Sequence, residues 1–183
     1  MGIFDTIYSV FFIFVFLVIG ISLIYEKKAH ISPSPVLPHV RLKALTLLPP
    51  HFKADGAYRI GDLGCGWGGL LMKLSRLFPK ASVIGYEISP FPFLLSWLRS
   101  SLFSNNVSAH RSDFFKADIS AFDIVFCYLS PWHMNQLKSQ FFQMKPGSVI
   151  ISCSFPIEGW EAERTDSVKS LFVSIPVFLY IIK

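Results

Sequence analysis

Arg59 to Gly69 read RIGDLGCGWGG, and this stretch decides the fold. Glycines stand at 64, 66, 68 and 69, directly before the amphipathic segment GLLMKLSRLF. The pattern predicts a strand that turns sharply into a helix through residues without side chains. Backbone N–H groups and a helix N-terminus would then face a ligand. We therefore expect a loop that binds a nucleotide-like cofactor.

Two kinds of cofactor fit this loop. The glycines at 64, 66 and 69 match the dinucleotide pattern G-x-G-x-x-G. Glu87, at the end of SVIGYE, could hold ribose hydroxyls as the acidic residue of that pattern does. Asp62, however, stands two residues before Gly64, where a carboxylate would repel a pyrophosphate. A carboxylate there suits S-adenosylmethionine, which has an ammonium group and no phosphates, and a dinucleotide oxidoreductase is the distant alternative.

The chain resembles the class I S-adenosylmethionine-dependent methyltransferases from about Pro35 to its C-terminus. The resemblance rests on five motifs in order: D-x-G-x-G-x-G at 62–68, the acidic end of SVIGYE, RSDFF, FDIVFCYL, and K-P-G before SVIISCSF. It implies that the loop wraps the methionine part of the cofactor and that Glu87 takes the ribose hydroxyls. It also implies that Asp113 meets the adenine amino group, with Phe114 against the ring. The implied cofactor-binding residues are Asp62, Gly64, Cys65, Gly66, Gly68, Glu87, Asp113 and Phe114.

Structural roles compete for some of these residues. Gly68 and Gly69 could serve only the packing of a helix on a strand. Ser-Asp at 112–113 is also an ordinary helix-start signal. Glu87 could be a solvated strand end, although a carboxylate beside the glycine loop is where a ribose would lie.

Strand-like and helix-like segments alternate along the rest of the chain at the intervals of a parallel sheet. Helices are expected in VRLKALTLL (40–48), GLLMKLSRLF, PFLLSWLRSSLF and MNQLKSQFFQM. The last stretch, SVKSLFVS and VFLYIIK separated by Ile175 and Pro176, instead predicts a β-hairpin. We expect an α/β, Rossmann-like, seven-stranded and mostly parallel sheet closed by a C-terminal antiparallel hairpin.

The N-terminal part of the chain differs from the rest. Residues 7–25, IYSVFFIFVFLVIGISLIY, carry no charge and are about as long as a helix that crosses a bilayer. A cleaved signal peptide fits poorly, since no basic residue precedes the run. The start MGIFDT also matches a myristoylation pattern, which we interpret as coincidence. One transmembrane helix is therefore expected to precede the sheet.

The flanks of this run predict its orientation and the domain boundaries. Lys27 and Lys28 follow the run, whereas no Lys or Arg precedes it, so the C-terminal part should face the cytosol. We expect a membrane anchor at 1–30 with a span of about 7–25, a proline-rich linker at 31–39, and a methyltransferase domain at 40–183.

The composition and charge of the chain limit the kinds of partner that we expect. The chain has 183 residues and a formal net charge of +5, which suits a domain near an anionic membrane. The sequence has no cluster of basic residues of the kind that binds nucleic acid, so we expect no nucleic-acid partner. The three cysteines, Cys65, Cys127 and Cys153, have no C-x-x-C spacing, so we expect buried reduced thiols and no metal.

The methyl acceptor is expected at YLSPW, residues 128–132, after the fourth strand, because ligands meet the carboxyl ends of strands in open α/β sheets. The candidate catalytic residues there are Tyr128, Ser130 and Trp132. The segment is similar to the [DN]-P-P-[YFW] motif of methyltransferases that act on planar or amide nitrogens. It lacks the polar first residue, which counts against a DNA, RNA or glutamine N-methyltransferase.

A second resemblance is closer. GYEISP, RSDFF, the Y-L-S-P strand end and SCSFPIEGW are similar to the small membrane-anchored protein-lysine methyltransferases that modify the adenine nucleotide translocase and the ATP synthase c subunit, and to their bacterial relatives. The resemblance implies lysine methylation on a membrane or membrane-associated protein. Tyr128, Phe155 and Trp160 are the aromatic residues we would place near the substrate amine. Methylation of a lipid or quinone-like molecule, and a non-catalytic scaffold, are the alternatives.

Overall fold

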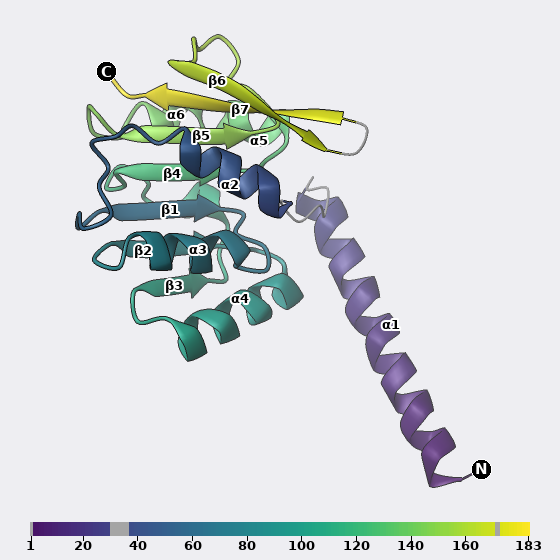
Figure 1. The fold of residues 1–183 in the computed structure, drawn as a ribbon. Coiled ribbons are helices and arrows are strands. Elements are labelled where there is room, and N and C mark those ends of the chain that lie inside the picture. Colours follow the sequence, from purple (N-terminus) through teal and green to yellow (C-terminus); the bar gives the residue numbers. More distant parts are fainter. Residues whose placement is uncertain (1, 30–36, 171–172) are drawn as a thin grey trace.

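The computed structural model describes residues 2–29, 37–170 and 173–183, and its centre is one seven-stranded sheet (Figure 1). The strands lie in the order β3-β2-β1-β4-β5-β7-β6. The neighbours from β3 to β5 pair in parallel, whereas β7 pairs antiparallel with both β5 and β6. The strands are β1 (Arg59–Leu63), β2 (Ser82–Tyr86), β3 (Val107–His110), β4 (Ile124–Cys127), β5 (Val149–Cys153), β6 (Arg164–Ser170) and β7 (Val173–Ile181). This confirms the predicted sheet and its closing hairpin.

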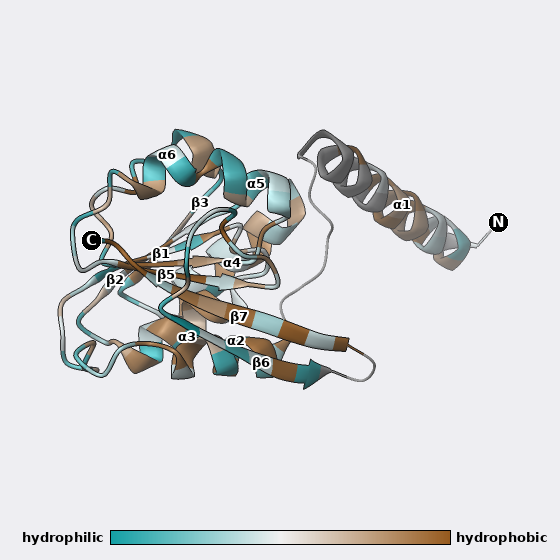
Figure 2. Cartoon of the chain, turned by 90° about the horizontal axis from the view of Figure 1, so that it is seen from above, coloured by the Kyte–Doolittle hydropathy of each residue, from teal (hydrophilic) through white to brown (hydrophobic). Residues whose placement is uncertain are grey.

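Helices cover both faces of the sheet. Figure 2 shows α2 and α3 on one face and α5 and α6 on the other. Helix α4 contacts α3 and β3 and lies at the β3 edge. The helices are α1 (Ile3–Ala29), α2 (Pro38–Thr46), α3 (Gly69–Leu77), α4 (Pro90–Phe103), the 3-10 helix η1 (Phe114–Lys116), α5 (Pro131–Gln136) and α6 (Lys138–Phe141).

Two hydrophobic cores, one on each face, hold the layers together. The first joins α2 and α3 to the sheet through Val40, Leu47, Leu71 and Leu74, among others. The second joins η1, α5 and α6 to the sheet and includes Phe114, Met134, Leu137 and Phe141. Because β4 and β5 are buried along their whole length, they contribute side chains to both cores.

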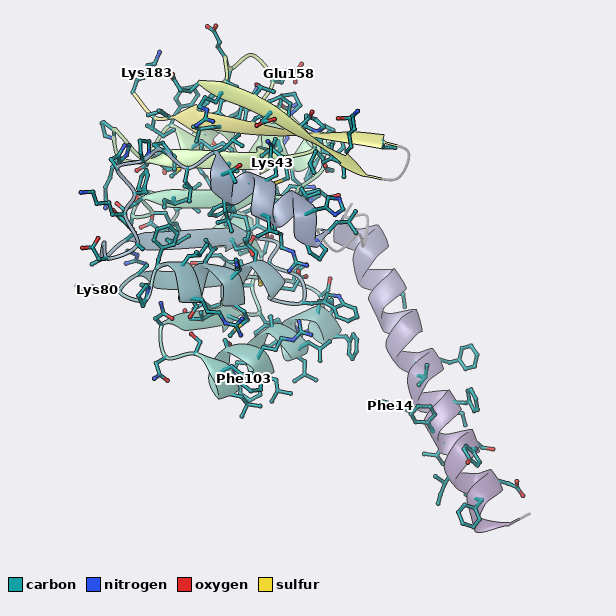
Figure 3. All side chains as sticks on the ribbon, in the orientation of Figure 1. Phe14, Lys43, Lys80, Phe103, Glu158 and Lys183 are labelled. Atoms are coloured by element: carbon teal, nitrogen blue, oxygen red, sulfur yellow. The ribbon has the colours of Figure 1, made fainter. Side chains whose placement is uncertain are left out.

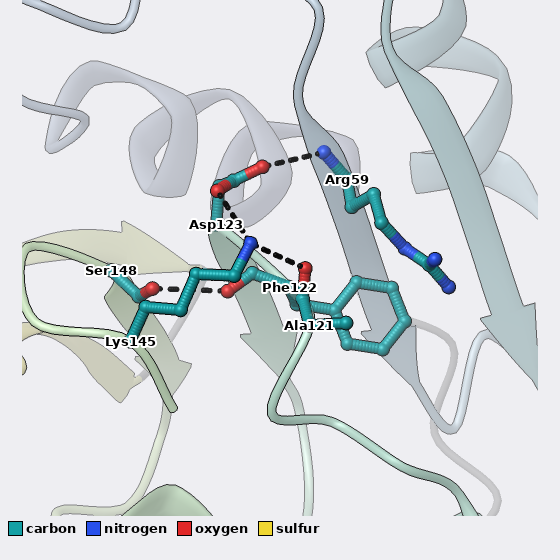
Figure 4. A network of polar contacts seen from close by, with 6 residues as sticks. All are labelled: Arg59, Ala121, Phe122, Asp123, Lys145 and Ser148. Carbon is teal, nitrogen blue, oxygen red and sulfur yellow. Dashed lines mark hydrogen bonds and ion pairs between the residues drawn. The ribbon is translucent and has the colours of Figure 1, made fainter. Parts of the chain in front are cut away.

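A polar network fixes the amino ends of the strands (Figure 4). Asp123, just before β4, accepts a hydrogen bond from the backbone N–H of Arg59 at 2.8 Å and pairs with Lys145 Nζ at 3.7 Å. Ser148 donates to the Phe122 carbonyl at 3.0 Å, and the Arg59 guanidinium lies over the Phe122 ring. These contacts lie at the edge of the sheet opposite the glycine loop, so they stabilise the fold and leave the carboxyl ends of the strands to a ligand.

Two elements differ from the sequence prediction. The helix expected in MNQLKSQFFQM is two short helices, α5 and α6, which meet at Leu137. Pro131 starts α5 earlier than expected, because proline suits the first helical turn. In the hairpin, Pro176 lies within β7 and not at the turn. Pairing of β7 with β5 begins only at Val177, so Pro176 lies where β7 has a single neighbour.

The N-terminal segment forms the helix α1 and stands apart from the two cores. A helix needs about 20 apolar residues to cross a bilayer, and none in the described part of the chain is long and apolar enough to do so. The transmembrane helix predicted over about 7–25 is therefore not supported. Most of the expected proline-rich linker, 31–39, lies outside the described residues, and Pro38 and His39 belong to α2.

Candidate cofactor and acceptor site

The glycine loop connects the carboxyl end of β1 to the start of α3. The backbone N–H groups of Gly64 and Cys65 both donate to the Tyr86 carbonyl at 2.9 Å, which ties the loop to the end of β2. Gly66 has a positive φ of 53°, and a Cβ atom built on it would meet no described atom within 4 Å. A side chain at Gly66 would therefore project into open space at the place where the loop can admit a ligand.

Glu87 holds the loop in this shape. Its Oε2 accepts a hydrogen bond from Gly66 N at 2.9 Å, and its Oε1 accepts one from Ser89 N at 2.7 Å. The side chain is buried, so it is not a solvated strand end. The carboxylate lies beside the open side of the loop, and its contact with the ribose remains a prediction.

Asp62 is a second buried carboxylate at this edge. Burial, followed by the nearby charge of Glu87, raises the pKa of Asp62 to about 7, while Arg41 opposes the shift. A buried carboxyl of this kind gains from a cation placed next to it. The ammonium group of S-adenosylmethionine is such a cation, so the donor set fits the expected cofactor.

Arg41 completes the site, and sequence reasoning did not find it. It lies on α2, and its guanidinium occupies the position where a Cβ atom of Gly69 would project. Its Nε is buried and has no hydrogen-bond partner among the described residues. A guanidinium at the start of α3 whose Nε has no partner among the described residues can bind the carboxylate of the cofactor's methionine part. The available signal in the sequence was a basic residue in the predicted helix that precedes the glycine loop.

Cys65 and Gly68 serve packing beneath the loop. A Cβ atom on Gly68 would lie 2.9 Å from the Ser96 Cβ atom of α4, so glycine permits this close approach. The Cys65 side chain packs against Gly85, and its Sγ lies 4.0 Å from the Ser96 hydroxyl. Burial raises the pKa of the Cys65 thiol well above its usual value. The other two cysteines are buried as well, which confirms the prediction of buried thiols.

The structure places Asp113 and Phe114 after β3, at the same edge of the sheet. Asp113 Oδ1 accepts a hydrogen bond from Phe115 N at 3.0 Å and so caps the helix η1. The Phe114 ring is buried in the second core and contacts Phe115 and His133. Both residues thus have structural roles, and their predicted contacts with adenine remain a prediction.

The acceptor segment brings Ser130 together with a residue that we did not select. Ser130 Oγ and His133 Nδ1 lie 2.7 Å apart and share a hydrogen bond. His133 is buried and stacks on Phe115, whose ring also meets Trp132 edge-on. Because Ser130 begins α5 just after β4, this polar pair lies at the carboxyl end of the strand. A Ser-x-x-His spacing at the start of a helix was the available signal.

The aromatic residues expected near the substrate separate into two groups. Tyr128 is half-buried after β4 and packs against the first core, and Phe155 is 39% exposed after β5. Trp160 lies elsewhere: its ring contacts Phe142 at 4.8 Å and Tyr180 at 6.1 Å in the second core. The packing of Trp160 supports a structural role, because the segment after β5 folds back over α6, and its contact with the amine remains a prediction.

Strand order, the open loop and its buried carboxylates define the chain as a class I S-adenosylmethionine-dependent methyltransferase. It belongs to the family described as the ANTKMT methyltransferase domain, whose model matches residues 62–164. This confirms the predicted family and cofactor.

Solved structures support the same class. An RNA methyltransferase from Salinibacter ruber, in complex with S-adenosyl-L-homocysteine, is 26% identical with a TM-score of 0.70, and the match covers 81% of this chain and 94% of that one. The magnesium protoporphyrin IX methyltransferase of Synechocystis PCC 6803 with bound SAM shares the fold, at 15% identity and a TM-score of 0.61, over 79% of this chain and 77% of that one.

Curated relatives fall into two groups. A protein-lysine N-methyltransferase of Saccharolobus islandicus is 27% identical over 124 residues, which cover 66% of this chain and 77% of that protein. A tRNA (guanine-N(7)-)-methyltransferase of Danio rerio is 38% identical over 76 residues, but these cover only 35% of this chain and 31% of that protein. The lysine methyltransferase thus matches almost twice as much of this chain.

Proposed function

We propose that this chain methylates the side-chain amine of a lysine in a protein. The observation that carries the proposal is the match to a protein-lysine N-methyltransferase over two thirds of the chain, against about one third for the tRNA methyltransferase. The acceptor segment supports it. YLSPW carries no carboxamide or carboxylate that would bind the edge of a base, and it places Tyr128 and Trp132 near the strand end, where aromatic faces attract an ammonium group.

The residues on the cofactor side have distinct roles in this proposal. When bound, S-adenosylmethionine supplies an activated methyl group. Asp62 would hold its ammonium group, Arg41 its carboxylate and Glu87 its ribose. The open backbone at Gly66 gives the cofactor close access to the loop. Catalysis then consists mainly of holding the amine in line with the methyl group and keeping water out.

A lysine amine arrives protonated at neutral pH and must lose its proton before it can accept a methyl group. Ser130 and His133 form a hydrogen-bonded pair at the carboxyl end of β4. We assign it the task of accepting this proton, with the imidazole taking it through the hydroxyl. Phe115, stacked on the imidazole, fixes the orientation of the ring.

The proposal is tested by incubating the protein with S-adenosylmethionine labelled in its methyl group and with protein, RNA and lipid fractions from its own source. We expect label in the protein fraction. Reductive methylation of that fraction beforehand blocks lysine amines and should abolish the labelling. Label that survives this treatment, or that enters RNA or lipid instead, would refute lysine as the acceptor. A Gly66→Val variant controls for label transferred by contaminating enzymes.

We also propose that the acceptor lies at the cytosolic side of a membrane and that residues 40–183 form the catalytic unit. The exposed apolar side chains on α1, such as Phe14 (Figure 3), support contact with a membrane. The lysines at 27 and 28 support its cytosolic side, because the anionic cytosolic leaflet attracts basic residues without requiring a spanning helix. Protease treatment of intact cells tests the orientation. A C-terminal epitope should be protected until the cells are lysed, and loss of the epitope in intact cells would contradict a cytosolic domain.

A further inference from the structure

Helix α4 turns its apolar side away from the sheet and its two cores. The residues that it buries are Ser96 and Ser100, and it contributes none of the described side chains of either hydrophobic core. On the opposite side, apolar side chains recur at helical spacing at Phe91, Leu94, Leu98 and Leu102, and they are exposed, up to 63% for Leu102. We call this surface the α4 face. It consists of Phe91, Leu94, Leu98 and Leu102, with the exposed Trp97 at its border.

The polar side of α4 is held firmly inward. Ser96 packs against Gly68 of the cofactor loop. At the other end of the helix, Ser104 and Ser75 of α3 lie 2.8 Å apart, and both contact the side chain of Asn106. Because these inward groups have partners, α4 cannot rotate its apolar side inward without breaking hydrogen bonds. The exposed apolar surface is thus built into the fold.

Exposed cations lie on α4 itself and on the neighbouring helix α3, at the same edge of the domain as the α4 face. Lys73 and Arg76 are exposed on α3, the neighbouring helix, and Arg99 is exposed on α4 itself. Glu87 is the single acidic residue in the sequence from 63 to 112, and it is buried. Acidic residues gather at the other edge of the sheet, where the segment 158–166 carries four. Figure 3 shows the two edges of the sheet domain, with Phe103 at the end of α4 near one edge and Glu158 near the other.

We propose that the α4 face lies on the surface of an anionic lipid bilayer. Large apolar side chains with a tryptophan at their border, near cations and free of acidic residues, are what an interfacial membrane site requires. A neutral protein groove would complement the apolar residues but not the cations. The acidic far edge favours the same orientation, because an anionic surface repels it.

This orientation would bring the cofactor loop close to the lipid. The Trp67 ring in the loop meets Phe91 at the start of α4 edge-on at 6.1 Å. Arg99 of α4 donates a hydrogen bond to the Trp67 carbonyl at 2.8 Å. A methyl acceptor at the membrane would then meet the cofactor side without a large movement of the domain. The lipid contact itself does not depend on the acceptor being a lysine.

An environment-sensitive thiol probe tests the contact in the full chain. The three native cysteines are buried, so the probe can be placed at Leu102→Cys on the α4 face. Phe142→Cys, at a phenylalanine 71% exposed beside α6, is the matched control. With vesicles of phosphatidylcholine and phosphatidylglycerol, we expect a blue shift of the probe at 102 and none at 142. A shift at both sites or at neither would overturn the proposal. A shift at 102 that depends on protein concentration without vesicles would show instead that a second copy covers the face.

A charge variant tests the choice of anionic lipid. Each cation near an anionic surface strengthens association about fivefold, so Lys73→Gln with Arg76→Gln should weaken vesicle binding roughly thirtyfold. Arg164→Gln with Lys169→Gln, both exposed on β6, makes the same change of net charge at the other edge and should have little effect. Equal losses in the two double variants, or equal binding to pure phosphatidylcholine, would contradict a specific face for anionic lipid.

Discussion

Asp62 is buried beside a second carboxylate, and this arrangement makes cofactor binding depend on pH. The pKa of Asp62 is about 7 in the cofactor-free protein. An ammonium group placed beside it favours the ionised form and lowers that pKa. Binding should therefore release a proton and become tighter as the pH rises through about 7. Calorimetry in buffers of different ionisation enthalpy measures this release, and an affinity that does not change between about pH 6 and 8 would contradict it.

The same carboxylate lowers the stability of the cofactor-free protein. Its pKa is raised from 3.8 to about 7 on folding, so the unfolded chain loses this proton first as the pH rises. Because the folded protein holds this proton more tightly, the proton on Asp62 contributes fully to the free energy of unfolding below pH 3.8. This contribution is lost as the pH rises through about 7. Asp62→Asn should thus stabilise the cofactor-free protein at about pH 8, by up to about 4 kcal/mol, while weakening cofactor binding. Melting curves with and without cofactor test both parts, and a less stable variant at that pH would be the contrary result.

Gly66 and Gly68 should respond differently to substitution. A side chain at Gly66 enters open space, so Gly66→Val should retain the fold, at a cost of about 1–2 kcal/mol for the positive φ, and lose cofactor binding. At Gly68 the same change meets Ser96 and should destabilise the protein further. Thermal unfolding and cofactor titration of the two variants separate the roles. Full cofactor affinity in Gly66→Val would exclude this loop as the binding site.

Arg41 provides a test of the methionine end of the site. Arg41→Gln removes the guanidinium that approaches Gly69 and should weaken S-adenosylmethionine about tenfold or more, because a charge-assisted hydrogen bond contributes about 1.5–3 kcal/mol. Lys43→Gln, on the same helix but paired with Asp166 of β6, is the control. Decarboxylated S-adenosylmethionine lacks the carboxylate, so it should bind Arg41→Gln and Lys43→Gln equally well. Equal losses with both ligands would show that Arg41 supports the loop and does not bind the carboxylate.

The sequence could predict only some of these residues. Asp62, Gly66 and Glu87 follow from spacing, because a strand, a glycine turn and the next strand bring them together locally. Arg41 and His133 come from other segments and reach the site through the packing of α2 and α5 on the sheet. The position of Arg41 depends on tertiary contacts that no local pattern encodes. The Ser-x-x-His spacing of Ser130 and His133 was visible in the sequence, but the burial of this pair at the end of β4 was not.

At the scale of elements, the alternation of strands and helices was readable because β4 and β5 are short apolar runs between amphipathic segments. The exposure of the apolar side of α4 could not be predicted from the sequence. Its apolar residues have ordinary helical spacing, and periodicity does not say which side of a helix faces the core. The fold of the segment after β5 was equally hidden, and this moved Trp160 from the expected acceptor side into the second core.

Substitution of Trp160 and substitution of Tyr128 should therefore have different effects on stability and turnover. Trp160→Ala should cost about 2–4 kcal/mol of folding stability and leave the turnover of the folded fraction unchanged, because the ring packs against Phe142 and Tyr180. Tyr128→Ala should lower turnover while cofactor affinity stays near that of the wild type. Chemical denaturation and steady-state kinetics on both variants distinguish them. Reduced turnover in Trp160→Ala without a loss of stability would return this residue to the site.

On the scale of the whole molecule, α1 is separate from the two cores that hold the sheet and its helices. A chain reduced to residues 37–183 should fold cooperatively and bind S-adenosylmethionine as tightly as the full chain, since both cores and the glycine loop lie within it. Calorimetry and thermal unfolding test this boundary. Loss of cofactor binding in the shortened chain would mean that α1 contributes to the site.

The most direct test of the proposed activity is the chemical identity of the methylated product. After transfer of labelled methyl groups to acceptors from the protein's own source, the labelled material is hydrolysed completely and its components are separated by chromatography. We predict that the label is recovered in methylated lysine and that Gly66→Val yields none. Label recovered in methylguanosine or in a lipid, with none in methylated lysine, would contradict the account.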